Sequence, residues 1–123
     1  MADISILCPT GHLGFTPLEP DSFRAGCALK PDFIIADSGS CDIGPYPLGA
    51  DGQASPAAWQ RHDLEIMLTE ARRLGVPMII GSASDTGTDR GVRQFAQIIR
   101  DVAAEKGMAP FRMATIFSEQ PRD

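Results

Sequence analysis

The sequence predicts a small α/β domain, with a three-layer, Rossmann-like arrangement of three helices around a four-stranded, mainly parallel sheet. Two patterns predict this class. Short apolar runs alternate along the chain with longer segments in which apolar residues recur every three or four positions. Each run ends in small polar or acidic residues, as strands do where they leave a buried parallel sheet. With 123 residues and a hydrophobic fraction of 43%, we expect one domain over residues 1–123.

The first half of the chain is expected to contain two strands joined by a short helix. Residues 4–8, Ile-Ser-Ile-Leu-Cys, are typical of a strand. A helix should begin at residues 20–22, Pro-Asp-Ser, because proline suits a first helical turn and an acidic residue suits its positive end. Residues 33–36, Phe-Ile-Ile-Ala, form the continuous apolar run of a buried parallel strand, and the chain turns polar at Asp37.

The middle of the chain is expected to hold a long helix and the third strand. Ser55 and Pro56 are typical of a helix start, with serine as the N-cap and proline in the first helical position. Gly75 is typical of the end of this helix, and residues 76–80 should form the third strand. The charged residues of the helix are expected to face solvent: His62, Asp63, Glu70, Arg72 and Arg73.

The last part of the chain is expected to hold a helix that ends at Lys106 and Gly107, followed by a fourth strand over residues 111–117. We expect the strand order 2-1-3-4, which leaves a crevice between the first and third strands; the alternative order 1-2-3-4 has no such crevice. Because no later segment covers the fourth strand, we expect a homo-oligomer or a partner subunit to pack against it.

Composition excludes several function classes. The net charge is −5 and no Lys/Arg-rich block occurs, so we expect no nucleic-acid partner. No apolar run approaches the roughly 18 residues of a membrane span, and residues 1–4 lack the features of a signal peptide, so we expect no membrane and a cytoplasmic location. Cys8, Cys27 and Cys41 have no CxxC spacing and are predicted to be reduced thiols; alternatively, Cys8 and Cys41 lie at the functional site.

Polar side chains follow all four predicted strands. The carboxyl ends of parallel strands meet at one edge of a sheet, where ligands bind in open α/β folds. We call this edge the rim, and we expect it to gather Thr10, His12, Asp37, Ser38, Ser40, Asp42, Ser82, Ser84, Asp85, Thr86, Asp89 and Glu119.

Three kinds of chemistry fit such a rim: a divalent cation held by oxygen ligands, acid–base work by carboxylates, or an anion held on backbone N–H groups. The candidate catalytic residues are Asp37, Asp42, Asp85 and His12, and the three aspartates are the candidate ligands if a divalent cation is the cofactor. The candidate substrate-binding residues are Thr10, Gly11, Ser38, Gly39, Ser40, Tyr46, Gly81, Ser82, Ser84 and Thr86.

Each candidate has a structural alternative. Asp85 or Thr88 could serve only as helix N-caps, which aspartate and threonine commonly are. His12 could hold a loop in place instead of transferring protons, and Tyr46 could close over the rim as a lid or simply pack. Asp37 is the strongest candidate, because it directly follows an apolar strand and the Ser-Gly-Ser after it does not begin a helix.

Two segments carry a family resemblance. Residues 36–49, Ala-Asp-Ser-Gly-Ser-Cys-Asp-Ile-Gly-Pro-Tyr-Pro-Leu-Gly, precede a long helix and then residues 79–83, Ile-Ile-Gly-Ser-Ala. They resemble the N-terminal part of the acyclic terpene utilisation (AtuA-like) family, with its Asp-x-Gly-Ser-x-Asp-x-Gly-Pro-Tyr-x-Leu-Gly and Gly-Ser-Ala-Gly-Gly type segments. The resemblance covers nearly the whole chain but only a fraction of a typical member, and this sequence departs from it at Ser84 and Asp85. It implies a bacterial catabolic role on small organic acids or their thioesters.

Two functions of different classes follow. The first is a small catabolic enzyme or enzyme domain that binds a small carboxylate or acyl-thioester substrate at the rim, for a lyase, hydratase or hydrolase reaction. The second is a non-catalytic small subunit or interaction module that completes the sheet of a partner chain.

Overall fold

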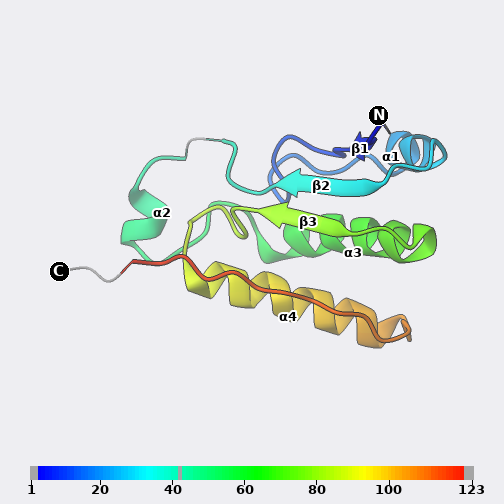
Figure 1. The fold of residues 1–123 in the computed structure, drawn as a ribbon. Helices are drawn as coiled ribbons and strands as arrows, with labels where there is room; N and C mark the ends of the chain where they lie inside the picture. The colour runs from blue at the N-terminus through cyan, green and yellow to red at the C-terminus, as the bar shows by residue number, and fades with distance from the viewer. Residues whose placement is uncertain (1–2, 42, 121–123) are drawn as a thin grey trace.

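The computed structural model describes residues 3–41 and 43–120, and within them the chain forms one sheet of three parallel strands and four helices (Figure 1). Alternation of strand and helix is therefore confirmed, whereas the predicted count of four strands and three helices is wrong. In chain order the elements are β1 (Ile6–Leu7), α1 (Pro20–Cys27), β2 (Phe33–Asp37), α2 (Tyr46–Gly49), α3 (Ala57–Leu74), β3 (Met78–Gly81) and α4 (Asp89–Glu105).

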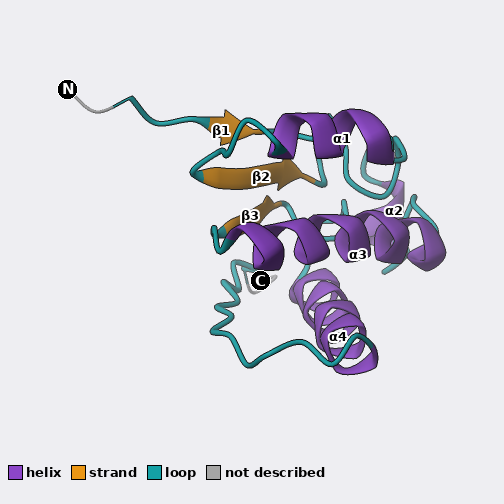
Figure 2. Ribbon diagram, turned by 90° about the vertical axis from the view of Figure 1, so that its right-hand side faces the viewer, coloured by secondary structure: helices purple, strands orange, loops and turns teal. Residues whose placement is uncertain are grey.

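The strands lie in the order β1-β2-β3, so the predicted order 2-1-3-4 is wrong and the alternative holds for the three strands present. Ile6 pairs with Phe33, and Ile34 pairs with Met78, both in parallel ladders. Both crossovers move to the next strand on the same side, and right-handed crossovers of this kind place their helices on the same face of the sheet. Figure 2 shows α1 and α3 together on one side, so the described residues form two main layers and not the predicted three.

The predicted fourth strand is absent, because residues 111–117 form no ladder with β3 or with any other described strand. The segment instead runs back along α4, in the same direction as β3 (Figure 1). Side chains hold it there: the Arg72 guanidinium lies 4.9 Å from the centre of the Phe111 ring, and that of Arg93 lies 5.0 Å from the Phe117 ring. These contacts fix its side chains without supplying the partner backbone, about 4.8 Å away, that a strand needs.

The core lies between the sheet and the helices. The predicted apolar faces of α3 and α4 are buried, as are Ile34 and Ala36 of β2, and α1 contributes Phe23 and Cys27. Asp63 and Glu70 of α3 were predicted to face solvent, but both are buried. None of the described helices combines the length and the apolar character that crossing a bilayer would need.

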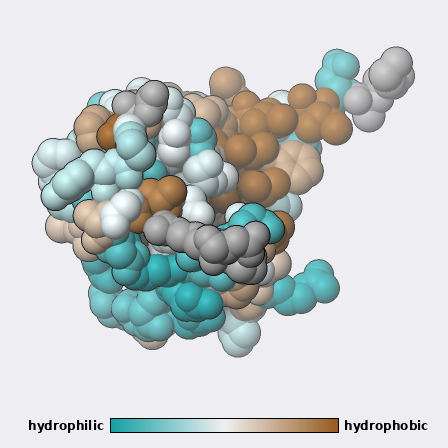
Figure 3. Space-filling model, turned by 90° about the vertical axis from the view of Figure 1, so that its left-hand side faces the viewer, coloured by the Kyte–Doolittle hydropathy of each residue, from teal (hydrophilic) through white to brown (hydrophobic). Residues whose placement is uncertain are grey.

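The opposite face of the sheet carries apolar side chains and, among the described residues, no helix (Figure 2). Side chains alternate between the two faces of a strand. Ile34 and Ala36 are buried under the helices, whereas Ile6 is 58% exposed and Ile79 is 47% exposed. Figure 3 shows apolar residues gathered on one side of the molecule, continuing toward its N-terminal arm. We call this surface the open face.

Candidate functional site

Ser38 joins the ends of the strands at the rim. Its backbone N–H donates to the Gly81 carbonyl at 2.9 Å, and its hydroxyl donates to the Leu13 carbonyl at 3.0 Å. The Leu13 N–H in turn donates to the Asp37 carbonyl at 2.8 Å. Because Ser38 is buried and its hydroxyl is engaged, its place is structural: it brings the loop after β1 and the exits of β2 and β3 together.

Asp37, Gly39, Gly81 and Ser82 meet beside this junction, and we call them the Asp37 cluster. Asp37 Oδ1 accepts a hydrogen bond from the Gly39 N–H at 3.0 Å. A Cβ atom at Gly39 would lie 2.7 Å from Ser82 Cβ and 3.9 Å from Asp37 Oδ1, and one at Gly81 would lie 3.6 Å from Asp37 Oδ1. Any side chain at Gly39 would therefore displace Ser82, so glycine is what allows the Ser82 side chain to lie over this backbone.

Two oxygen atoms of the Asp37 cluster have no hydrogen-bond partner among the described residues: Asp37 Oδ2 and the Ser82 hydroxyl. Asp37 is partly buried and Ser82 is exposed, so both can reach a ligand. Ser82 also has a φ of 49°, in the left-handed region that non-glycine residues seldom adopt and that recurs at functional sites. The cluster can thus offer a carboxylate and a hydroxyl side by side at the end of the sheet.

His12 is buried in the loop between β1 and α1, residues 8–19, which we call the rim loop. Its Nδ1 accepts a hydrogen bond from the Cys41 N–H at 3.3 Å, which leaves the proton of the neutral ring on Nε2. The ring stacks on Phe15 with 5.2 Å between centroids, and Nε2 is buried without a partner in the described structure. The described contacts therefore make His12 a support of the loop and do not connect it to the Asp37 carboxylate.

Asp85 is committed to the segment before α3. Its carboxylate accepts from the Ser55 hydroxyl at 2.8 Å and from the backbone N–H groups of Ser55 and Ala54 at 3.1 Å and 3.4 Å. Ser55 is consequently not the N-cap of α3, which begins at Ala57 after Pro56. These contacts bind Asp85 to its own chain, and they leave it poorly placed for a substrate or a cation.

The remaining predicted residues after β3, together with Glu119, contact the start of α4. Thr88 caps α4 by accepting from the Gly91 N–H at 3.1 Å, as the N-cap alternative predicted, and its hydroxyl lies 3.0 Å from that of Thr86. Ser84 is fully buried against α4, where a Cβ atom at Gly91 would clash with the Ser84 hydroxyl. Glu119 accepts from the Asp89 N–H at 3.0 Å, so it caps the same helix end.

The remaining predicted site residues include Thr10, Ser40, Tyr46 and Asp42. Thr10 donates to the Thr16 carbonyl at 2.8 Å, and Ser40 donates to the Gly11 carbonyl, so both hydroxyls stabilise the rim loops. Tyr46, in the one-turn helix α2 that the sequence did not predict, is 81% exposed. Asp42 lies outside the described residues. Within residues 3–41 and 43–120, no three His, Cys, Asp or Glu side chains gather closely enough to hold a metal ion.

Asp63 was predicted to face solvent, and this prediction is wrong. It is fully buried, and its carboxylate accepts from the Gly14 and Leu18 N–H groups, each at 2.9 Å, so it fixes the rim loop from below. The available signal was its position on the helix: Asp63 shares the apolar face with Leu64 and Met67. A residue at that position is buried because of its place on the helix, even when its side chain is charged.

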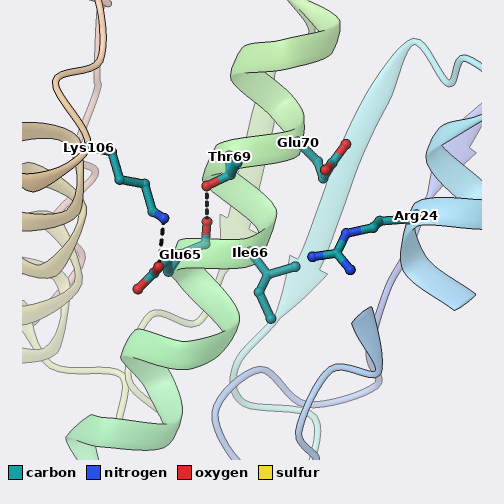
Figure 4. A pocket seen from close by; sticks show the side chains of 6 residues that line it. All are labelled: Arg24, Glu65, Ile66, Thr69, Glu70 and Lys106. Carbon is teal, nitrogen blue, oxygen red and sulfur yellow. Dashed lines mark hydrogen bonds and ion pairs between the residues drawn. The ribbon is translucent and has the colours of Figure 1, made fainter. Parts of the chain in front are cut away.

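A groove on the outer side of α3 collects charges of both signs (Figure 4). It encloses about 120 Å³ and is lined by Arg24, Glu65, Ile66, Thr69, Glu70 and Lys106. The Lys106 ammonium lies 2.8 Å from the Glu65 carboxylate, and this hydrogen bond lowers the pKa of Glu65 below its usual value, against the opposing effect of burial. Because its charged groups pair with neighbours, the groove is a helix junction and a weaker candidate than the Asp37 cluster.

Comparisons with known proteins do not assign a family. A scan against protein-family models and searches of curated proteins and of solved structures found no match for this chain. The similarity to the AtuA-like family stays a prediction.

Proposed function

We propose that the chain is an enzyme or enzyme domain of the AtuA-like, Rossmann-like type, which transfers a proton to or from a small acyl substrate at the Asp37 cluster. The observation that carries the proposal is that a carboxylate and a hydroxyl, each with an oxygen free among the described residues, both lie close to the bare backbone of Gly39. A carboxylate with one anchored and one available oxygen suits a general base, and an adjacent hydroxyl suits a carbonyl oxygen.

The orientation of the substrate follows from charge. Asp37 would repel a substrate carboxylate placed directly beside it, because two like charges in one site disfavour each other. An acyl thioester or another uncharged carbonyl therefore faces Asp37, and any carboxylate of the substrate points away from it. Lyases and hydratases that act on such substrates use a general base to exchange the proton on the carbon beside the carbonyl, so the proposal names this proton transfer.

The backbone supports the family part of the proposal. The sequence departs from the Gly-Ser-Ala-Gly-Gly pattern at Ser84 and Asp85. Both residues have φ in the left-handed region, at 70° and 60°. Glycine adopts that region most readily, so the two positions retain the conformation that a glycine pair would favour.

Exchange of substrate protons for deuterium tests the proposed activity. Short acyl thioesters would be incubated with the protein in D₂O, and loss of the proton signal beside the carbonyl would be followed by NMR. Asp37→Asn should slow the exchange by about 10²-fold or more, as loss of a general base does. Asp101→Asn is the control, since Asp101 is an exposed carboxylate near the C-terminal end of α4, the end away from the rim. Exchange by the wild type at the rate of buffer alone, or equal rates in the wild type and Asp37→Asn, would refute the proposal.

The open face favours a second candidate function, a subunit that completes a larger assembly. Parallel sheets normally bury both faces, and Ile6 and Ile79 on this face are half-exposed. We infer that a second copy or a partner chain packs here. Light scattering at micromolar concentration should show an oligomer that Ile79→Lys dissociates, whereas a monomeric mass unchanged by this substitution would argue against assembly through the open face of this chain.

A further inference from the structure

A recess lies at the beginning of α3, and it shares no lining residue with the Asp37 cluster. It encloses about 360 Å³, within the usual size of small-molecule pockets, and is lined by Pro17, Ala58, Trp59 and His62. Trp59 is the only tryptophan of the chain, and 49% of its surface is exposed. An indole and a proline ring supply apolar surface to the lining, which suits a planar ligand.

His62 lines this recess, and a hydrogen bond to Asp63 defines the tautomer of its ring. Its Nδ1 lies 2.9 Å from Asp63 Oδ1, and that carboxylate already accepts two backbone N–H groups. The carboxylate can only accept, so His62 Nδ1 donates to it, and the neutral ring carries its lone pair on Nε2. The side chain of His62 is 48% exposed, whereas that of Asp63 is fully buried. A buried carboxylate that fixes the tautomer of a partly exposed histidine is the arrangement that prepares imidazole as an acceptor.

We propose that this recess binds a flat aromatic ligand that carries one hydroxyl or ring N–H donor, with its ring on Trp59 and its donor on His62 Nε2. The site does not depend on the proposed activity of the Asp37 cluster. It does share the rim loop, because Pro17 lines the recess and the Asp63 carboxylate that orients His62 also fixes Gly14 and Leu18.

A pair of matched probes tests the hydrogen bond on the wild-type protein alone. 4-Methylphenol has the required donor, and 4-methylanisole has the same ring with that donor methylated. Titration of each would be followed through the NMR signal of the Trp59 indole N–H. We expect 4-methylphenol to bind about tenfold more tightly, the contribution of one good hydrogen bond. Equal affinities, or no change in the Trp59 signal with either probe, would overturn the proposal.

Variants assign the effect to His62. His62→Phe keeps a ring in place and removes the nitrogen, so it should abolish the difference between the two probes. Arg61→Gln is the control, because Arg61 precedes His62 and contacts Glu65 and Glu105 outside the recess. It should keep the difference. The Gly14 and Leu18 amide signals report whether the loop is intact in each variant. A folded His62→Phe protein that still prefers 4-methylphenol would contradict the assignment of the acceptor to His62.

Discussion

Asp63 and Asp37 differ in how many hydrogen bonds their carboxylates accept from the protein. Asp63 is fully buried, and its two oxygens accept from Gly14, Leu18 and His62. Asp37 is partly buried and accepts from the Gly39 N–H alone among the described residues. The first carboxylate is saturated by the fold, and the second retains capacity for a ligand. The residue type is the same in both places, so the difference in role comes from the number of satisfied lone pairs.

The comparison separates the rim residues in the same way. Asp85 and Thr10 were predicted to contact a substrate, yet their oxygens are engaged by their own chain. Ser82 was predicted on the same grounds, and its hydroxyl has no partner in the part of the chain that the structure describes. Proximity to the rim is therefore a weaker criterion for a functional residue than the availability of its polar atoms.

The largest expected effect contrasts the two aspartates directly. Asp63→Ala leaves the Gly14 and Leu18 N–H groups buried and unpaired, which should lower the free energy of unfolding by about 2–5 kcal/mol. Asp37→Ala removes one exposed hydrogen bond and should lower it by less than about 1 kcal/mol. Urea denaturation of the two variants measures both values. A greater loss for Asp37→Ala than for Asp63→Ala would mean that Asp37 has a structural role.

An intermediate effect is expected where Ser84 packs on α4. Gly91→Ala places a methyl group against the Ser84 hydroxyl and 2.7 Å from the Ala83 carbonyl oxygen. We expect it to lower the free energy of unfolding by about 1–3 kcal/mol. Ser84→Gly in the same chain should restore part of the loss, because it removes the clashing hydroxyl and suits the φ of 70° at this position. Thermal denaturation of the single and double variants would show this, and additive losses would mean that Ser84 does not contact Gly91.

The smallest expected effect concerns Glu65, a half-exposed carboxylate that is paired with Lys106. The pKa of Glu65 is lowered chiefly by its hydrogen bond from Lys106. A lowered folded-state pKa stabilises the protein above the unfolded pKa, and this stability is lost as the pH falls through the folded pKa. Lys106→Met should therefore cost less than about 1 kcal/mol at neutral pH and nothing at acidic pH.

Lys30→Met is the control for that experiment, since Lys30 is the other lysine of the chain and forms no ion pair within residues 3–41 and 43–120. Urea denaturation from neutral pH to about pH 3 would compare the two variants. If the stability of Lys106→Met falls with pH as steeply as that of the wild type, the Glu65–Lys106 pair does not contribute.

The sequence predicted the local elements better than their arrangement. The continuous apolar runs before Asp37 and Gly81 form strands, and the helical spacing of apolar residues predicts α3 and α4, because both patterns depend on neighbouring residues. Strand order depends on the direction of each crossover, which no local pattern encodes. Residues 111–117 are apolar enough for a strand, but a strand also needs a partner backbone, and the contacts of Phe111 and Phe117 hold them on the helices.

The site was predictable to the extent that strand ends locate it. Asp37 and Ser82 meet because both follow paired strands, and that inference requires only the strand positions. The commitment of Asp85 to Ser55 joins segments separated by a whole helix, so no pattern near either residue reveals it. Asp63 was misjudged because aspartate is usually exposed, and its position on the helix was outweighed by its charge.

The strand order has a consequence for how the chain acquires its structure. Each strand pairs with the strand that precedes it in sequence, so every ladder closes the shortest loop that a parallel sheet allows. The strands β1 and β2 can therefore pair, with α1 between them, before α3 and β3 leave the ribosome, and β3 can add to an existing edge. A chain that must insert a late strand between two earlier ones has no such route. This protein is accordingly suited to growing from its N-terminus during synthesis, with its rim formed one strand at a time.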